Sequence, residues 1–241
     1  MENKFYILGA VLIAVFLVFT SSSCLNNQCS SNEFSYEIAV FDSMLLDEGD
    51  IDKNLTPIDE SNNNLSWQGE DEEKRVLMVT WTKYPSSYPV GETVRTSWGD
   101  TWVTVYPELK NYFTSHPTTN EDLKLQTAQL LGMPPDTNNS YFVELWVKPG
   151  DLFRPSADNE INDTVSQLNF PPSTDLTYKE WFLNNTIDSY FANRFPWTRL
   201  GYTYHWDNPE SKIGLSEYVI KENSEVLVKS KAPTLDYLNR G

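Results

Sequence analysis

Two glutamates lie inside segments that consist mainly of apolar and aromatic residues. Glu217 occurs in IGLSEYVI (213–220) and Glu144 in YFVELWV (141–147). If both segments are strands, the alternation of side chains places each carboxyl group on an apolar face. Burying a lone carboxylate is costly, so such a group is paired, protonated or exposed for a reason. Because shifted pKa values and acid–base catalysis concentrate at positions of this kind, Glu217 and Glu144 are candidate catalytic residues.

The segment PWTRLGYTYHW (196–206) supplies two further candidate catalytic residues, Arg199 and His205. As a strand, it would place its alternate aromatic residues in the core and these two side chains on the opposite face. At about 3.3 Å per residue they are about 20 Å apart, so both reach one small ligand only if the strand bends, for which Gly201 is suited. The alternative is that the segment only fills the core, and that each glutamate lies on an edge strand or pairs with Arg154 or Arg199.

Metal and nucleotide motifs are weak in this chain. SADNEINDT brings Asp158, Glu160 and Asp163 together as in a calcium loop. It lacks the glycine and the late glutamate of an EF-hand, so a solvated loop is the favoured interpretation. His116 and His205 have no zinc-ligand spacing, and there is no GxSxG, GxGxxG or phosphate-loop pattern. We therefore predict no metal site, and the residues identify no cofactor.

The stretch GLSEYVIKENSEVLV (214–228) resembles one segment of the ADP-ribosyltransferases. In that family a catalytic glutamate on a strand precedes aromatic and apolar residues, a turn and a further strand. The resemblance covers only these residues. It implies that Glu217 would hold a ribose hydroxyl of NAD and stabilise an oxocarbenium-like transition state. Leu215 stands where the family has a second glutamate, and no nicotinamide-site residue is matched.

The elements that must position these side chains follow an α+β pattern. Dense β-type runs and alternation predict strands at 75–81, 101–106, 140–150, 198–206, 213–220 and 225–229. Capping boxes predict two principal helices, one near 119–131 and one that starts at Thr177 and ends before Pro196. Short connections between these elements predict a mainly antiparallel sheet in a single globular domain, residues 75–241.

The N-terminus has the pattern of a secretory signal peptide. A charged start precedes an apolar run, Phe5–Phe19, which as a helix would extend about 22 Å, against about 30 Å for the hydrocarbon core of a bilayer. The next residues, TSSSC, resemble the lipobox of bacterial lipoproteins, although Ser21 stands where an aliphatic residue is usual. We therefore expect a signal peptide over residues 1–23 and lipidation of Cys24. Plain secretion, an uncleaved anchor and a Cys24–Cys29 disulfide are the alternatives.

Residues 24–74 are rich in Asn, Ser, Asp and Glu, with only the short apolar islands YEIAVF and SMLL between them. Such a composition predicts an acidic, flexible tether, with packing of part of it on the domain as the alternative. The whole chain holds 34 Asp and Glu against 18 Lys and Arg, a net charge of −16. Because this charge repels phosphate backbones, we expect no nucleic-acid partner.

These features together predict an exported, extracytoplasmic protein whose lipid anchor makes a membrane its partner. The favoured hypothesis for its activity is a binding or envelope-associated module. Such a module would use aromatic residues such as Trp98, Trp102 or Trp197 on a saccharide or a protein surface. The sequence leaves the oligomeric state open.

Two other classes of function compete with the binding module. One is an extracytoplasmic enzyme centred on Glu217 or Glu144, and the other is a structural surface lipoprotein. A cleft that joins Glu217 to Arg199 or His205 would favour the enzyme. An exposed patch of tryptophans would favour binding, and a surface with neither would favour the structural role.

Overall fold

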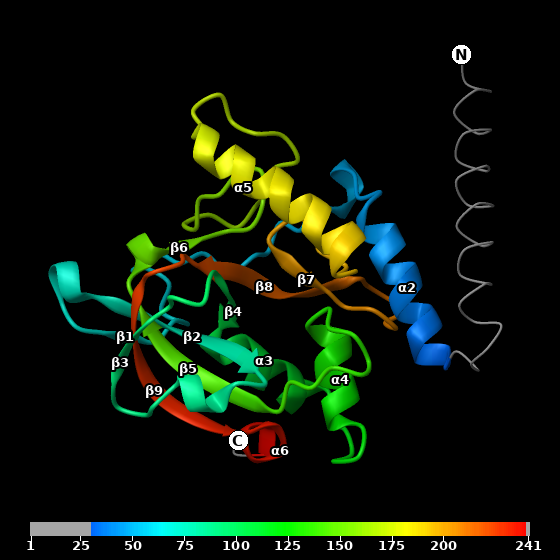
Figure 1. The fold of residues 1–241 in the computed structure, drawn as a ribbon, viewed down its shortest axis with the longest axis horizontal. Coiled ribbons are helices and arrows are strands. Elements are labelled where there is room, and N and C mark those ends of the chain that lie inside the picture. The colour runs from blue at the N-terminus through cyan, green and yellow to red at the C-terminus, as the bar shows by residue number, and fades with distance from the viewer. Residues whose placement is uncertain (1–29, 240–241) are drawn as a thin grey trace.

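An antiparallel β-sheet forms the centre of the computed structural model, which describes residues 30–239 (Figure 1). Among these residues the strands follow the order β3-β9-β5-β2-β4-β8-β6, with β1 paired to β2 and β7 to β8. The strands are β1 (Trp67–Gln68), β2 (Arg75–Thr82), β3 (Thr93–Arg95), β4 (Thr101–Val105), β5 (Tyr141–Val147), β6 (Leu152–Phe153), β7 (Tyr202–Tyr204), β8 (Ile213–Ile220) and β9 (Glu225–Pro233). The prediction of an α+β domain with a mainly antiparallel sheet is confirmed.

Five α-helices accompany the sheet within the described part of the chain, and the two predicted helices are among them. They are α2 (Ser31–Ser43), α3 (Tyr106–Ser115), α4 (Leu123–Leu130), α5 (Leu176–Ile187) and α6 (Thr234–Asn239). The two predicted helices correspond to α4 and α5, and α5 continues into a π-helical turn, η5 (Asp188–Ala192). Helix α3 escaped prediction because it follows β4 without a connecting residue and has no capping side chain.

The two faces of the sheet carry separate parts of the core. On one face, Val79 of β2 packs in a cluster with Val40 of α2 and Leu109 of α3. On the other face, Met78 of the same strand packs in a second cluster with Ile58 from the segment before β1. Successive residues of β2 therefore point to opposite faces of the sheet. Helices cover one face, and the segment between α2 and β1 packs on the other.

Residues 30–74 are part of this fold, so the prediction of a flexible tether is wrong for them. Helix α2 starts at a capping box between Ser30 and Glu33 and buries Tyr36, Ala39 and Val40 in the core. Its burial follows the three-to-four-residue spacing of an amphipathic helix, which the average composition of this acidic segment conceals. After the helix, Leu55, Ile58 and Leu65 are also buried; these three residues fix the segment that leads to β1.

We expect Val40→Ala to lower the free energy of unfolding by about 2 kcal/mol, because the side chain is fully buried in the core. Ile38→Ala is the matched control on the same helix, since Ile38 is 51% exposed and its truncation should change stability by less than about 0.5 kcal/mol. Urea denaturation of the full chain measures both. If α2 did not pack on the sheet, the two variants would be equally stable.

The predicted signal peptide (1–23) and the predicted lipidation site, Cys24, lie outside the described residues, as does Cys29. Within the described part, no helix combines the length and the apolar character that crossing a bilayer requires.

Candidate functional site

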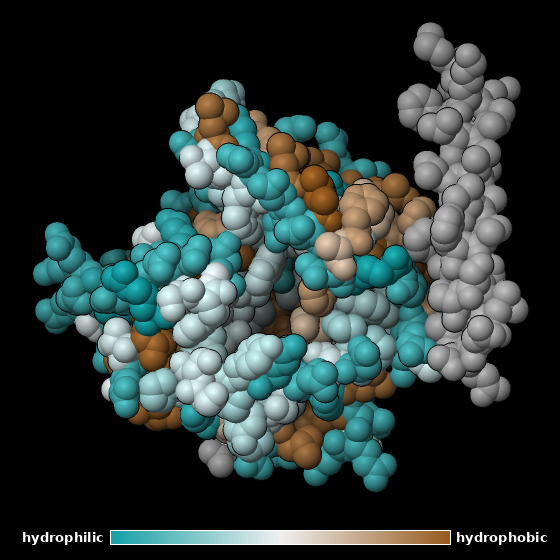
Figure 2. Space-filling view, in the orientation of Figure 1, coloured by the Kyte–Doolittle hydropathy of each residue, from teal (hydrophilic) through white to brown (hydrophobic). Residues whose placement is uncertain are grey.

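A cavity of about 700 Å³ opens on the helix-covered side of the sheet. Its walls come from β2 and β4 of the sheet, from the loop after α4, from the segment that follows η5, and from one residue of β8, Glu217. A hollow is visible near the centre of this face of the molecule in Figure 2. The volume is within the range of pockets that hold a small organic ligand.

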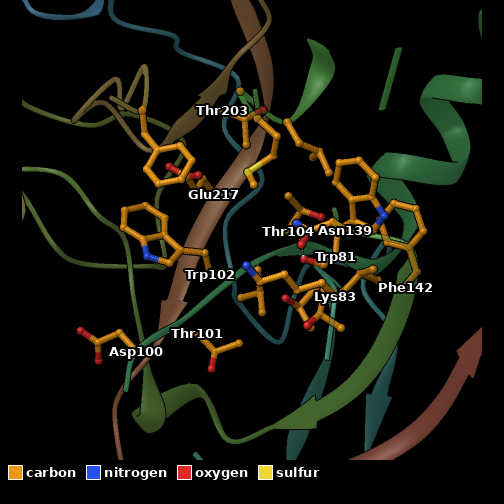
Figure 3. A pocket seen from close by; sticks show the side chains of 18 of the residues that line it. Trp81, Lys83, Asp100, Thr101, Trp102, Thr104, Asn139, Phe142, Thr203 and Glu217 are labelled. Atoms are coloured by element: carbon orange, nitrogen blue, oxygen red, sulfur yellow. Dashed lines mark hydrogen bonds between the residues drawn. The ribbon is translucent and has the colours of Figure 1, made fainter. Parts of the chain in front are cut away.

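Glu217 extends into this cavity from the middle of β8 (Figure 3). Its Cα pairs across the sheet with that of Thr104, and its backbone N–H donates to the carbonyl of Gly201 at 2.9 Å. The carboxyl group has no hydrogen bond or ion pair with any other residue that the structure describes. Because Glu217 borders the cavity, the residue as a whole is only half-buried. Its carboxyl group nevertheless lies deep in the protein, and burial alone raises the pKa of this group to about 8. Glu217 is therefore largely protonated at neutral pH.

Several aromatic rings form part of the cavity wall. Trp102 of β4 packs edge-on against Trp197, with ring centroids 6.0 Å apart. Trp81 of β2 stacks on Phe142 of β5 at 5.8 Å, and its indole N–H donates to Thr234 Oγ1 at 2.9 Å. In Figure 3 Trp102 lies on the side of Glu217, whereas Trp81 and Phe142 lie on the opposite side. These contacts hold the walls in a fixed geometry.

Few polar groups complete the lining. The indole nitrogen of Trp197 and the side-chain nitrogen of Asn185 are buried and have no hydrogen-bond partner. Asp100 already accepts hydrogen bonds from the indole of Trp181 and from a backbone N–H. Lys83 is the only basic side chain among the described residues that line the cavity. The site thus offers one unpaired carboxyl group, and the two unpaired nitrogens are enclosed in its walls.

Glu144 lies on the same face of the sheet but outside the cavity. Its Cα pairs with Val79, which pairs with Thr104, the partner of Glu217. Three strand spacings of about 4.8 Å separate the two glutamates, roughly 14 Å. Glu144 forms an ion pair with Lys229 at 3.0 Å and accepts a hydrogen bond from Tyr237 at 3.1 Å. Glu144 therefore forms a structural ion pair, which was the alternative to a catalytic role. Its partner is Lys229 and not Arg154 or Arg199.

Arg199 does not reach the cavity, because the predicted strand 198–206 is regular only over β7. Arg199 and Gly201 both have positive φ angles, of 58° and 76°, and the chain turns there. The Arg199 guanidinium donates to the carbonyls of Ser43 and Met44, each at 3.2 Å. Arg199 thus caps the C-terminal end of α2, where a positive charge is favourable.

His205 is buried beside the ring of Tyr112, with centroids 5.6 Å apart, and it does not line the cavity. Burial, with a smaller contribution from His116, lowers the pKa of His205 to about 4, so the ring is neutral at physiological pH. Its Nδ1 contacts the Asn208 side chain at 3.2 Å. Of the four predicted site residues, only Glu217 lies in the cavity, joined there by the predicted binding tryptophans Trp98, Trp102 and Trp197.

The acidic cluster of Asp158, Glu160 and Asp163 brings three carboxylate oxygens within 4.8 Å of one another. Arg154, which is fully buried, donates to Asp163 Oδ1 at 2.5 Å, to the Asp163 carbonyl and to the Val165 carbonyl at 3.2 Å. The guanidinium supplies a positive charge within the cluster. We describe the cluster as an ion-pair network around Arg154.

The sequence analysis did not identify Lys83, Thr104 and Asn185, which also line the cavity. Thr104 alternates with Trp102 in TWVTV, so the strand pattern does place the two on one face. Asn185 is distant in sequence and carries no local signal. No family model matches the chain, and neither the curated proteins nor the solved structures contain a significant match to it.

Proposed function

We propose that this protein is an exported, lipid-anchored module that binds a small organic molecule in the cavity around Glu217. One observation carries the proposal: an aromatic-walled cavity surrounds a carboxyl group that has no partner among the described residues. Pockets with mostly apolar walls and a few convergent polar groups are typical of small-molecule sites.

The contrast with Glu144 supports a binding role for Glu217. Both carboxyl groups lie on the same face of the sheet, and Glu144 is paired with Lys229 and Tyr237. A buried acid that only served folding would be expected to have such partners, because an unpaired one destabilises the folded state. Glu217 instead leaves its hydrogen-bonding capacity free at the cavity. A ligand would satisfy it.

The screen that tests this proposal uses the full chain in detergent and a panel of neutral, cationic and anionic fragments. Binding in the cavity should shift the indole N–H NMR signals of Trp81, Trp102 and Trp197, which line it. Trp67 lies outside the lining and serves as the internal control. If no fragment at millimolar concentration shifts the three cavity signals, the proposal fails.

Export and anchoring depend on the leader sequence. Residues 25–30 connect Cys24 to the domain and could span at most about 20 Å if fully extended. A lipid on Cys24 would therefore hold the domain close to the membrane surface. We expect fatty-acid labelling of the wild type and of Cys29→Ala, and none of Cys24→Ala. Equal labelling of all three proteins would contradict the anchoring.

An enzyme centred on Glu217 is the second candidate, and the raised pKa of about 8 favours it, since such a group can act as a general acid at neutral pH. The resemblance to ADP-ribosyltransferases would make NAD the substrate. Lys83 alone gives the lining little with which to hold a pyrophosphate. Turnover of NAD by the wild type and its loss in Glu217→Gln would favour this candidate over the binding module.

A further inference from the structure

We propose that the group bound at Glu217 is an organic cation, a protonated amine or a quaternary ammonium on a small apolar frame, with Glu217 as its counter-ion. This inference rests on the proposed function, because it names the ligand class of the same cavity. Three features of the cavity support it: the charges of its lining residues, its aromatic walls and the position of Lys83.

The charge balance of the cavity favours a positive ligand. The Glu217 carboxyl group has no ion pair among the described residues, and the second acid of the lining, Asp100, is hydrogen-bonded to Trp181. Removing an ionised carboxylate from water is costly unless an opposite charge lies beside it. A cationic ligand would supply that charge, whereas an anionic ligand would add repulsion.

The walls favour the same class of ligand. The faces of tryptophan, tyrosine and phenylalanine rings attract cations, and this attraction is stronger at sites shielded from water. Trp102 lies on the side of Glu217, and Trp81 and Phe142 lie across the cavity from it (Figure 3). A cation between these walls would contact a carboxylate on one side and aromatic rings on the other.

Lys83 is not the counter-ion of Glu217. Its ammonium group lies over the ring of Tyr84, 5.2 Å from the centroid, and Tyr84 is 60% exposed. Lys83 itself is exposed, and it forms no ion pair with Glu217. The lysine therefore belongs to the rim of the cavity and leaves the position beside Glu217 to a ligand.

Binding of a cation should release a proton from Glu217, whereas binding of a neutral ligand should not. Burial keeps Glu217 largely protonated at about pH 7, because its pKa is about 8. A cation stabilises the carboxylate, so the carboxyl proton leaves to the buffer as the ligand binds. A neutral ligand of the same shape leaves the proton in place.

The test is titration calorimetry of the full chain in detergent at about pH 7, in two buffers of different ionisation enthalpy. The probes are two isosteric pairs, choline with 3,3-dimethyl-1-butanol and cyclohexylammonium with cyclohexanol. We expect at least one cation to bind about tenfold or more tightly than its neutral partner and to release most of one proton. The neutral partners should release none.

Two variants locate the effect. Glu217→Gln keeps the size of the side chain and should abolish both the preference for the cation and the proton release. Glu144→Gln is the matched control, because Glu144 lies on the same sheet face but outside the cavity, and it should retain both. Circular dichroism establishes that each variant is folded before titration.

Two outcomes would overturn the inference: neutral probes that bind as tightly as their cationic partners, or no binding of either cation. If the fragment screen still shifts the cavity indole signals, the small-molecule module stands and only the ligand class is wrong. If that screen also fails, both proposals fall.

Discussion

Replacing Arg154 with methionine is expected to lower the free energy of unfolding by about 3–5 kcal/mol. The guanidinium is fully buried and donates to Asp163 Oδ1 and to the backbone carbonyls of Asp163 and Val165. Methionine fills much of the volume but donates no hydrogen bond, so these acceptors would lose their donor in the folded state. The loop from Arg154 to Val165 would then lose the group that orders it.

Denaturation with urea at about pH 7 measures this effect. Arg95→Met is the control, because Arg95 forms an exposed ion pair with Glu225, and such pairs contribute at most about 1 kcal/mol. A loss below about 1 kcal/mol in Arg154→Met would mean that the guanidinium does not organise the loop.

Glu217→Gln is expected to remove a pH-dependent destabilisation of about 5 kcal/mol. The pKa of Glu217 is raised from 4.5 to about 8 in the folded protein, so between these values the folded state binds a proton that the unfolded state has lost. The stability contributed by this proton is fully present below about pH 4.5 and is lost as the pH rises through about 8. Glutamine does not titrate and shows no such loss.

The free energy of unfolding is measured for the wild type and for Glu217→Gln from about pH 5 to about pH 9. The difference between the two curves reports on Glu217 alone, because the other titrating residues are the same in both proteins. We expect the variant to gain on the wild type steadily with pH and to be the more stable protein above about pH 8. Parallel curves would indicate that Glu217 has an ordinary pKa, as a solvated or paired carboxyl group does.

The sequence predicted the parts of the fold that depend on local patterns. IGLSEYVI and YFVELWV are so rich in β-branched, aromatic and other apolar residues that the predicted strands correspond to β8 and β5. The alternation of side chains along a strand placed both Glu217 and Glu144 on apolar faces, but it did not show that the two glutamates have different roles. Their different roles depend on strand order, because Lys229 reaches Glu144 from β9, beside β5, whereas Thr104 of β4 offers no charge to Glu217.

The remainder depends on contacts between distant segments. Helix α2 is stable because Tyr36 and Val40 find a place in the core, which composition does not reveal. The turn at Arg199 and Gly201, with positive φ angles, directs Arg199 to the end of α2 instead of the cavity. A period-two pattern has no means to indicate such a change of direction.

The protonation of Glu217 tests the central claim most directly, because the account depends on an unpaired carboxyl group in the cavity. A ¹³C NMR titration of the side-chain carboxyl carbon, assigned by the loss of its signal in Glu217→Gln, measures the pKa in the ligand-free protein. We predict a midpoint near 8. A midpoint near the ordinary value of 4.5 would show that the group is solvated or paired and would contradict the account.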